Sequence, residues 1–262
     1  MDINNFVIDR ILRGVALHTG TGEVLYSVNQ IENPTLTCAA EGTDAVDALG
    51  SPIMTFERSK TAEFSAENSL IDLGLLATQM GTTKKIATAD NKVITPQFET
   101  VDVTKDMTEY TLKHEPIEDI DKIYVLNGDS TLGKKYTSGV SSTASTFVYD
   151  KTAHKITLPS GLKPDSQLFI MYEYESDKAV EIVNSATKFP QSCKFIMQVL
   201  GADVCDTSTL IFAYLIFPNC KLSSNVELTF TTEGKHPFSL KANQAYCDKE
   251  KKLFQIVVPE SE

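Results

Sequence analysis

The sequence predicts a mainly β chain of two lobes with a single well-marked helix. Three observations support this fold class. Runs of alternating apolar and polar residues recur along the 262 residues, and clusters of Asn, Gly and Pro separate them, as between half-buried strands. One segment has clear helical spacing. The C-terminal strand-like runs follow one another without helices between them, which favours antiparallel pairing.

The first segment, residues 1–104, begins with strand-like runs. Residues 22–39 are broken by Asn, Pro and Gly, so we expect a hairpin, or two strands, with a turn near Asn33-Pro34. Residues 51–63 alternate in polarity and predict a half-buried strand. These runs need an apolar partner from elsewhere in the chain.

Residues 65–81 predict the helix. Ser65 and Asn68 are expected to cap its start, and Gly81 is expected to end it. Gly74 lowers helix stability by about 0.8–1 kcal/mol relative to Ala, so packing against a sheet must compensate. The apolar residues spaced to face that sheet are Leu70, Ile71, Leu73, Leu75, Leu76 and Met80.

The middle segment, residues 105–178, has short strands separated by turns. One strand covers residues 123–126 and ends at the turn Asn127-Gly128. A hairpin is expected around residues 147–159, and a further strand follows at 167–176. This spacing is typical of a small β-sandwich.

The last segment, residues 179–262, predicts four or five strands, including an alternating run at Val226, Leu228 and Phe230. These are the most apolar strands of the chain. We therefore expect residues 1–104 and 179–262 to form one discontinuous β domain, into which residues 105–178 are inserted.

Charge excludes one class of function. The formal net charge is -11, with 24 Lys and Arg against 35 Asp and Glu, and only three of the basic residues are Arg. A protein that grips a phosphate backbone needs clustered basic residues, so nucleic-acid binding is not expected. The three segments carry net charges of -7, -3 and -1.

The sequence shows no targeting or cross-linking feature. The N-terminus lacks the apolar core of a secretory signal, and no apolar run is long enough to span a bilayer, so no membrane association is expected. The five cysteines have no C-x-x-C spacing, which favours free thiols in a reducing compartment.

Residues 128–134 match the first seven positions of a phosphate-binding G-x-x-x-x-G-K loop. Lys135 stands where Ser or Thr would ligate Mg²⁺, and no helix is predicted after it. We therefore interpret the segment as a Gly-bracketed loop between two strands. Gly20-Thr21-Gly22 is an even weaker dinucleotide signal, and a hairpin turn explains it.

Other chemically active residue types form no convergent set. The carboxylates Glu118, Asp119 and Asp121 lack the spacing of a Ca²⁺ loop, and Glu173 and Glu175 lie on one strand face rather than across a cleft. The histidines form no metal or catalytic motif, and they are His18, His114, His154 and His236. Nearby lysines could lower the pKa of Cys247, but a core or turn thiol is the simpler interpretation. We assign no catalytic, cofactor-binding or metal-binding residue, expect no cofactor, and predict that the protein is not an enzyme.

The C-terminal region resembles the end of bacteriophage tail tube proteins, also called major tail proteins. The resemblance lies in residues 226–259, where a strand ending in TEG leads to PFSLKA, a polar turn and a final apolar strand, and in the preceding LIFAYLIFPNCKLS. Residues 51–81 resemble the strand-then-helix element of the same family. The middle segment resembles an Ig-like insertion of phage structural proteins, and the likeness covers about two thirds of the chain.

This resemblance implies a β-sandwich or half-barrel with one flanking helix. It further implies that six copies join their sheets edge to edge into a ring, that rings stack into a hollow tube, and that DNA passes through without specific binding during ejection. Partners would be other copies of the chain, with tail sheath, baseplate or tail terminator proteins as further candidates. The protein would be made in the host cytoplasm and reside in the virion tail. The alternative is another phage component, such as an Ig-like head decoration protein or a monomeric binding protein.

Overall fold

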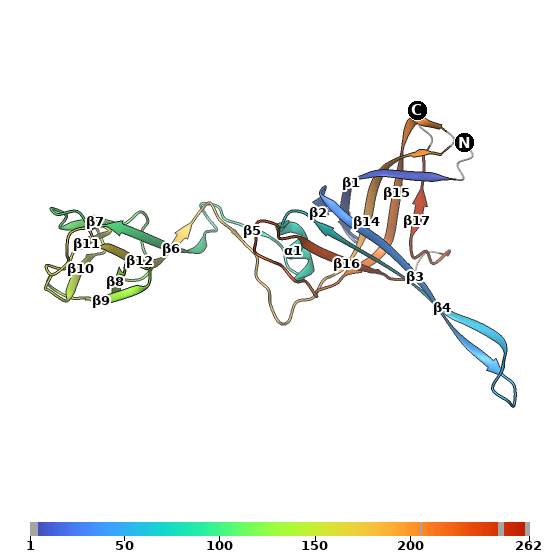
Figure 1. Cartoon of the computed structure of the whole chain (residues 1–262), viewed down its shortest axis with the longest axis horizontal. Coiled ribbons are helices and arrows are strands. Elements are labelled where there is room, and N and C mark those ends of the chain that lie inside the picture. Colours follow the sequence, from blue (N-terminus) through green and yellow to red (C-terminus); the bar gives the residue numbers. More distant parts are fainter. Residues whose placement is uncertain (1–4, 205, 246–248, 260–262) are drawn as a thin grey trace. The chain divides into compact units, whose positions relative to one another are not determined.

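The computed structural model describes residues 5–204, 206–245 and 249–259. It confirms a mainly β chain, and α1 (Leu73–Gln79) is the one helix among these residues (Figure 1). The chain divides into a first unit, Met1–Lys84 with Ile182–Glu262, and a second unit, Lys85–Glu181. The boundary expected near residue 104 lies between residues 84 and 85 instead, because residues 93–102 form a strand of the second unit.

The first unit is built on one curled sheet in the order β2-β1-β14-β15-β16-β4-β3, with β17 paired to β15. Its strands are β1 (Phe6–His18), β2 (Val24–Val28), β3 (Ile31–Val46), β4 (Pro52–Asn68), β14 (Ser192–Asp203), β15 (Asp206–Leu222), β16 (His236–Ala242) and β17 (Gln255–Val257). The C-terminal strands β14, β15 and β16 lie together between β1 and β4, which come from the N-terminal segment. The early strands therefore obtain their apolar partners from the C-terminal segment.

The core of the first unit lies on one face of this sheet. Four phenylalanines from β4, β14, β15 and β16 meet there, with ring centroids of neighbouring pairs 5.7–6.5 Å apart. They are Phe64, Phe195, Phe217 and Phe238, and all are buried. Such aromatic pairs each contribute about 0.5–1.5 kcal/mol beyond the area they bury. The contacts hold together strands that are far apart in sequence.

Two strand predictions for this unit are wrong. No turn occurs at Asn33-Pro34, because β3 runs through both residues. The pairing of β3 with β4 is irregular there, and Asn33 has a φ of 50°. The alternating run from Val226 to Phe230 is not a strand. Phe230 is largely exposed, so this stretch has no sheet face against which its apolar side chains could pack.

The helix is shorter than expected. Strand β4 continues to Asn68, so Ser65 and Asn68 do not cap it, and Asp72 is the N-cap, its Oδ1 accepting the Leu75 N–H at 2.6 Å. The C-cap is Met80. Gly81 ends the helix as expected, with a φ of 67° that favours glycine, and a Cβ there would lie 2.3 Å from the Phe189 backbone.

The second unit contains a seven-stranded sheet in the order β6-β12-β8-β9-β10-β11-β7. Its strands are β6 (Val93–Asp102), β7 (Glu109–Thr111), β8 (Lys122–Leu126), β9 (Leu132–Ser138), β10 (Thr146–Asp150), β11 (Lys155–Thr157) and β12 (Gln167–Ser176). The pair β9–β10 is parallel and the others are antiparallel. Strands β5 (Lys85–Ile86) and β13 (Val180–Glu181) pair where the chain enters and leaves this unit.

A buried carboxylate joins the two ends of this sheet. Glu99 of β6 accepts a hydrogen bond from the Tyr110 hydroxyl of β7 at 2.5 Å, from the Lys113 N–H at 3.1 Å, and from the Tyr172 hydroxyl of β12. Strands β6 and β7 are first and last in the sheet order, so the sheet curls until its ends meet around the core. Burial first, and the bond to Glu99 second, raise the pKa of Tyr110 to about 12.

Candidate assembly surfaces

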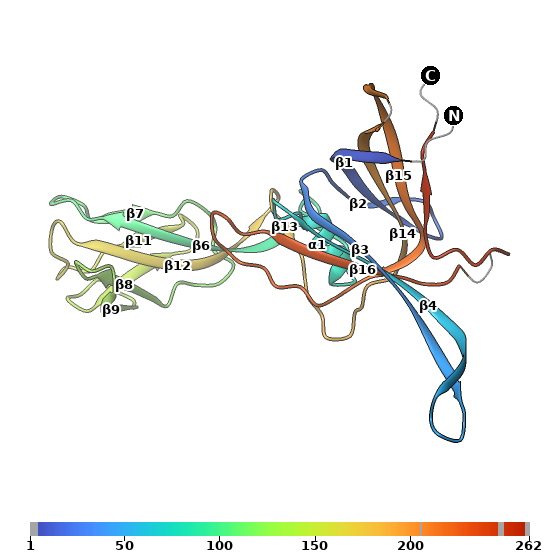
Figure 2. The same cartoon turned by 45° about the vertical axis from the view of Figure 1, so that its right-hand side comes forward.

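The far part of the β3–β4 hairpin projects from the sheet of the first unit (Figures 1 and 2). We call residues 37–60 the arm, since every residue in this range is exposed. Strand β16 pairs with β4 only as far as Glu63, so beyond that point β3 and β4 pair with each other alone. The arm is thus held by its own ladder of backbone hydrogen bonds and not by a core.

The arm carries large apolar side chains that are each more than half exposed. Leu49 at its tip is 92% exposed. Its other exposed apolar residues are Val46, Ile53, Met54 and Phe56. Several exposed apolar side chains in one segment are typical of an interaction surface, because burying them against a partner stabilises by about 25 cal/mol per Å² of apolar area. The arm is therefore a candidate contact site for a second protein chain.

The sheet of the first unit has free edges on opposite sides. Residues 6–13 of β1 pair with β14 only, because β2 covers just residues 14–17 of the other edge. On the far side, β17 pairs with residues 214–216 of β15 and is itself the outermost strand there. Free backbone N–H and C=O groups at a sheet edge are a template for pairing with another chain.

The face of β14 and β15 turned away from the core is also apolar at one end, beyond Lys194 and Gln198. Leu200 lies opposite Phe212, and Ala202 lies opposite Leu210. Phe212 and Leu210 are both exposed, although they follow the same strand whose other face forms the core. A sheet that is apolar on both faces is typical of one whose second face is covered by another layer.

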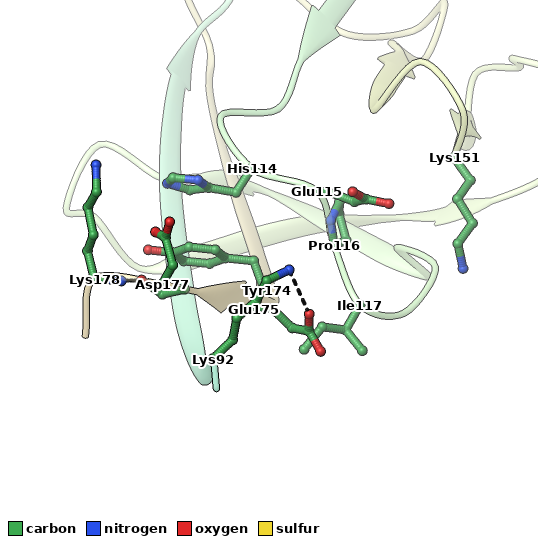
Figure 3. A pocket seen from close by; sticks show the side chains of 11 residues that line it. Lys92, His114, Glu115, Pro116, Ile117, Lys151, Tyr174, Glu175, Asp177 and Lys178 are labelled. Carbon is green, nitrogen blue, oxygen red and sulfur yellow. Dashed lines mark hydrogen bonds and ion pairs between the residues drawn. The ribbon is translucent and has the colours of Figure 1, made fainter. Parts of the chain in front are cut away.

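The second unit has an open groove of about 620 Å³ beside the end of β12 (Figure 3). His114 stacks on Tyr174 with ring centroids 3.9 Å apart, and Lys92 forms an ion pair with Glu175 at 3.1 Å. Three lysines and three carboxylates line the groove, so it favours neither sign of charge. Its lining does not converge on one position in the way that catalytic groups do.

The residues that match the phosphate-binding motif, 128–134, form part of a β-hairpin. Residues 127–131 form the turn that joins β8 to β9 in a hairpin, with the Ser130 N–H bonded to the Asn127 carbonyl at 2.9 Å, and residues 132–134 of the motif already lie in β9. Lys134 donates to the Ala144 carbonyl at 3.1 Å and lies over the Tyr136 ring. No helix follows, so the phosphate-binding geometry is absent from this loop.

His236 has a structural role that the sequence did not indicate. It lies on β16 fully buried, and its Nε2 is 2.7 Å from Gln79 Oε1 of α1. Its Nδ1 accepts the Asp72 N–H at 3.2 Å, so Nδ1 carries no proton and Nε2–H donates to Gln79. Burial lowers the pKa of His236, against a smaller opposing effect of Asp72. The neutral imidazole thus fastens the helix to the sheet.

Of the other acidic residues considered as sites, Glu173 lies beside Glu118, Asp119 and Asp121 on one groove, whereas Glu175 does not line that groove. Glu118, Asp119 and Asp121 lie in the loop before β8, and Glu173 and Glu175 lie on one face of β12, as expected. Cys193 and Cys220 meet in the core with Sγ atoms 3.7 Å apart, whereas Cys247 lies outside the described residues. Within the described ranges, no three His, Cys, Asp or Glu residues are grouped as metal ligands would be, and no helix is long and apolar enough to cross a membrane.

Comparison with known proteins identifies the family. The sequence model of the YomU/Tube protein family matches residues 7–254. This range includes the arm, the whole second unit and most of the first unit, and it ends just before strand β17. No curated protein matches the chain.

Proposed function

Because the chain belongs to the YomU/Tube protein family, we propose that it is a structural protein of a bacteriophage tail tube that assembles by joining its sheets across copies. The observation that carries this proposal is the pair of free edges, residues 6–13 of β1 and strand β17, on opposite sides of one sheet. A contact between two different edges leaves each copy with one edge still free. Repeating the contact covers both of these edges in every copy only when a ring closes.

The arm suits a second type of contact. It extends beyond the sheet, and its apolar residues Leu49, Ile53 and Phe56 are exposed in the single chain. We propose that it packs against a copy in the neighbouring ring, so that rings stack into a tube. The six-fold ring is the order implied by the family resemblance.

The charge supports a conduit that does not hold DNA. The first unit has nineteen acidic and thirteen basic residues, and the second has sixteen and eleven, which gives net charges of -6 and -5. The acidity is therefore shared by the two units rather than concentrated in the tube-forming one. We propose that a wall with excess carboxylates repels phosphates and lets DNA slide during ejection.

Electron microscopy of the purified full chain tests the proposal. Rings or tubes of uniform width support it, and growth with concentration is expected because each copy keeps a free edge until closure. Monomers alone at high concentration and low salt would overturn it. A discrete oligomer bound to capsids would favour the alternative, a head decoration protein. Sheath, baseplate and terminator proteins are further proposed partners in the virion, and we propose no catalytic role.

A further inference from the structure

The outer face of β6 and β12 carries a second groove in the second unit, of about 290 Å³. Its floor is apolar. Phe98 of β6 and Met171 of β12 are cross-strand partners, and Pro96 lies two residues before Phe98 on β6. Phe98 is 60% exposed and Met171 is 55% exposed, although Phe98 also packs on Phe169 with ring centroids 5.7 Å apart.

The rim of this groove is acidic. Glu118, Asp119, Asp121 and Glu173 line it, against Lys122 as the one basic lining residue of the groove. Asp119 forms an ion pair with Lys151 at 3.2 Å, which leaves an excess of carboxylates around the apolar floor. The groove of Figure 3, with equal numbers of both signs, has no such preference. We call the groove floored by Phe98 and Met171 the acidic groove.

We propose that the acidic groove binds an extended basic segment of another protein, anchored by apolar side chains. Carboxylates around an apolar floor favour a partner with lysine or arginine beside each anchor, since like charges across a contact are unfavourable. Anchors two residues apart on an extended segment fall about 6.6–7 Å apart on one face, and Pro96 and Phe98 have that same spacing on β6. Pro96 lacks an N–H, which weakens backbone pairing of a partner segment along the free edge of β6. The segment therefore binds on the face of the sheet.

This inference deepens the proposed function, because it gives the second unit a partner of defined chemistry. The probe is a fluorescein-labelled synthetic peptide that alternates Lys with Leu or Phe, titrated into the full chain and followed by fluorescence anisotropy. Two matched peptides carry Glu in place of Lys, or Ser in place of Leu and Phe. We expect saturable binding of the first peptide alone, and weaker binding at higher salt.

Variants locate the site. Phe98→Ser is expected to weaken binding at least about fivefold, as for a central apolar anchor, and the double variant Glu118→Gln/Asp121→Asn is expected to weaken it about three- to tenfold. Leu132→Ser is the apolar control, since Leu132 is exposed on β9, and Asp90→Asn/Asp106→Asn is the charge control. All positions are exposed or on the surface, and circular dichroism confirms folding of each variant.

Three results would overturn the proposal: no binding of the Lys peptide, equal binding of the Ser-substituted peptide, or unchanged affinity in both groove variants. Equal loss in the control variants would also overturn it, because general attraction to an acidic protein would then explain the binding. Electron microscopy of the same variants separates the two proposals. Variants that lose peptide binding but still form rings or tubes test the acidic groove alone. Failure to form rings or tubes tests the proposed function instead.

Discussion

His236 and Asp72 are 164 residues apart in the sequence, yet the Asp72 N–H donates to His236 Nδ1 at 3.2 Å. Asp72 also caps α1, and the other nitrogen of His236 bonds to Gln79 at the end of the same helix. One buried imidazole therefore contacts both ends of α1 from strand β16.

This contact predicts that the chain loses stability in mild acid. Burial lowers the folded-state pKa of His236, while the unfolded chain takes up a proton near pH 6.5. As the pH falls below about 6.5, the unfolded state binds more protons, so the free energy of unfolding falls by up to about 1.4 kcal/mol per pH unit until the folded pKa is reached. Urea unfolding at pH 7.5 and 5.0 measures this. His236→Gln should lose most of the slope, whereas His114→Gln, at an exposed position, should keep it.

Removal of the buried carboxylate should destabilise the second unit. Glu99→Ala leaves two tyrosine hydroxyls and the Lys113 N–H without their acceptor, which we expect to cost about 3 kcal/mol or more. Tyr110→Phe removes one donor and should cost about 1 kcal/mol. Amide hydrogen exchange in β6 and β12 measures both. Equal protection in Glu99→Ala and wild type would contradict the assigned network.

Glycine is required at position 81 but not at position 50. Both have positive φ, 67° and 84°, but a Cβ at Gly81 would lie 2.3 Å from the Phe189 backbone, whereas at Gly50 it would meet nothing within 4 Å. Gly81→Ala should therefore cost about 3 kcal/mol or more, against about 1 kcal/mol for Gly50→Ala. Thermal unfolding of the two variants compares them. Similar melting temperatures would count against the close approach.

Charged residues introduced on the arm should impair assembly without impairing folding. Leu49→Asp and Phe56→Asp place carboxylates on exposed residues outside the core, so the free energy of unfolding should change by less than about 0.5 kcal/mol. Tube length in electron micrographs should fall sharply, because an unpaired charge would be buried at the stacking contact. Leu132→Asp, on the exposed face of β9, is the control. Normal tubes in both arm variants would exclude the arm from the stacking contact.

Local pattern was enough to predict the elements that the chain forms with its near neighbours. The strand at residues 51–63, the helix ended by Gly81, and the hairpin around residues 128–134 are all present. The half-burial expected at residues 51–63 was wrong, because residues 51–60 lie in the exposed arm, where no core covers either face. The family resemblance was confirmed by the match over residues 7–254. The helix start was wrong, because Ser65 and Asn68 have good capping side chains but are held in β4 by pairing with β16 and β3.

Composition and short-range periodicity by themselves determined the β class, the single helix and the acidic charge, because each is a property of adjacent residues. Only the tertiary structure decided that residues 226–230 are not a strand, that β6 belongs to the second unit, and that His236 and Glu99 are buried. Those outcomes depend on which distant segment supplies a partner. Strand pairing and burial of polar groups are set by contacts between residues far apart in the chain, and one-dimensional patterns do not record them.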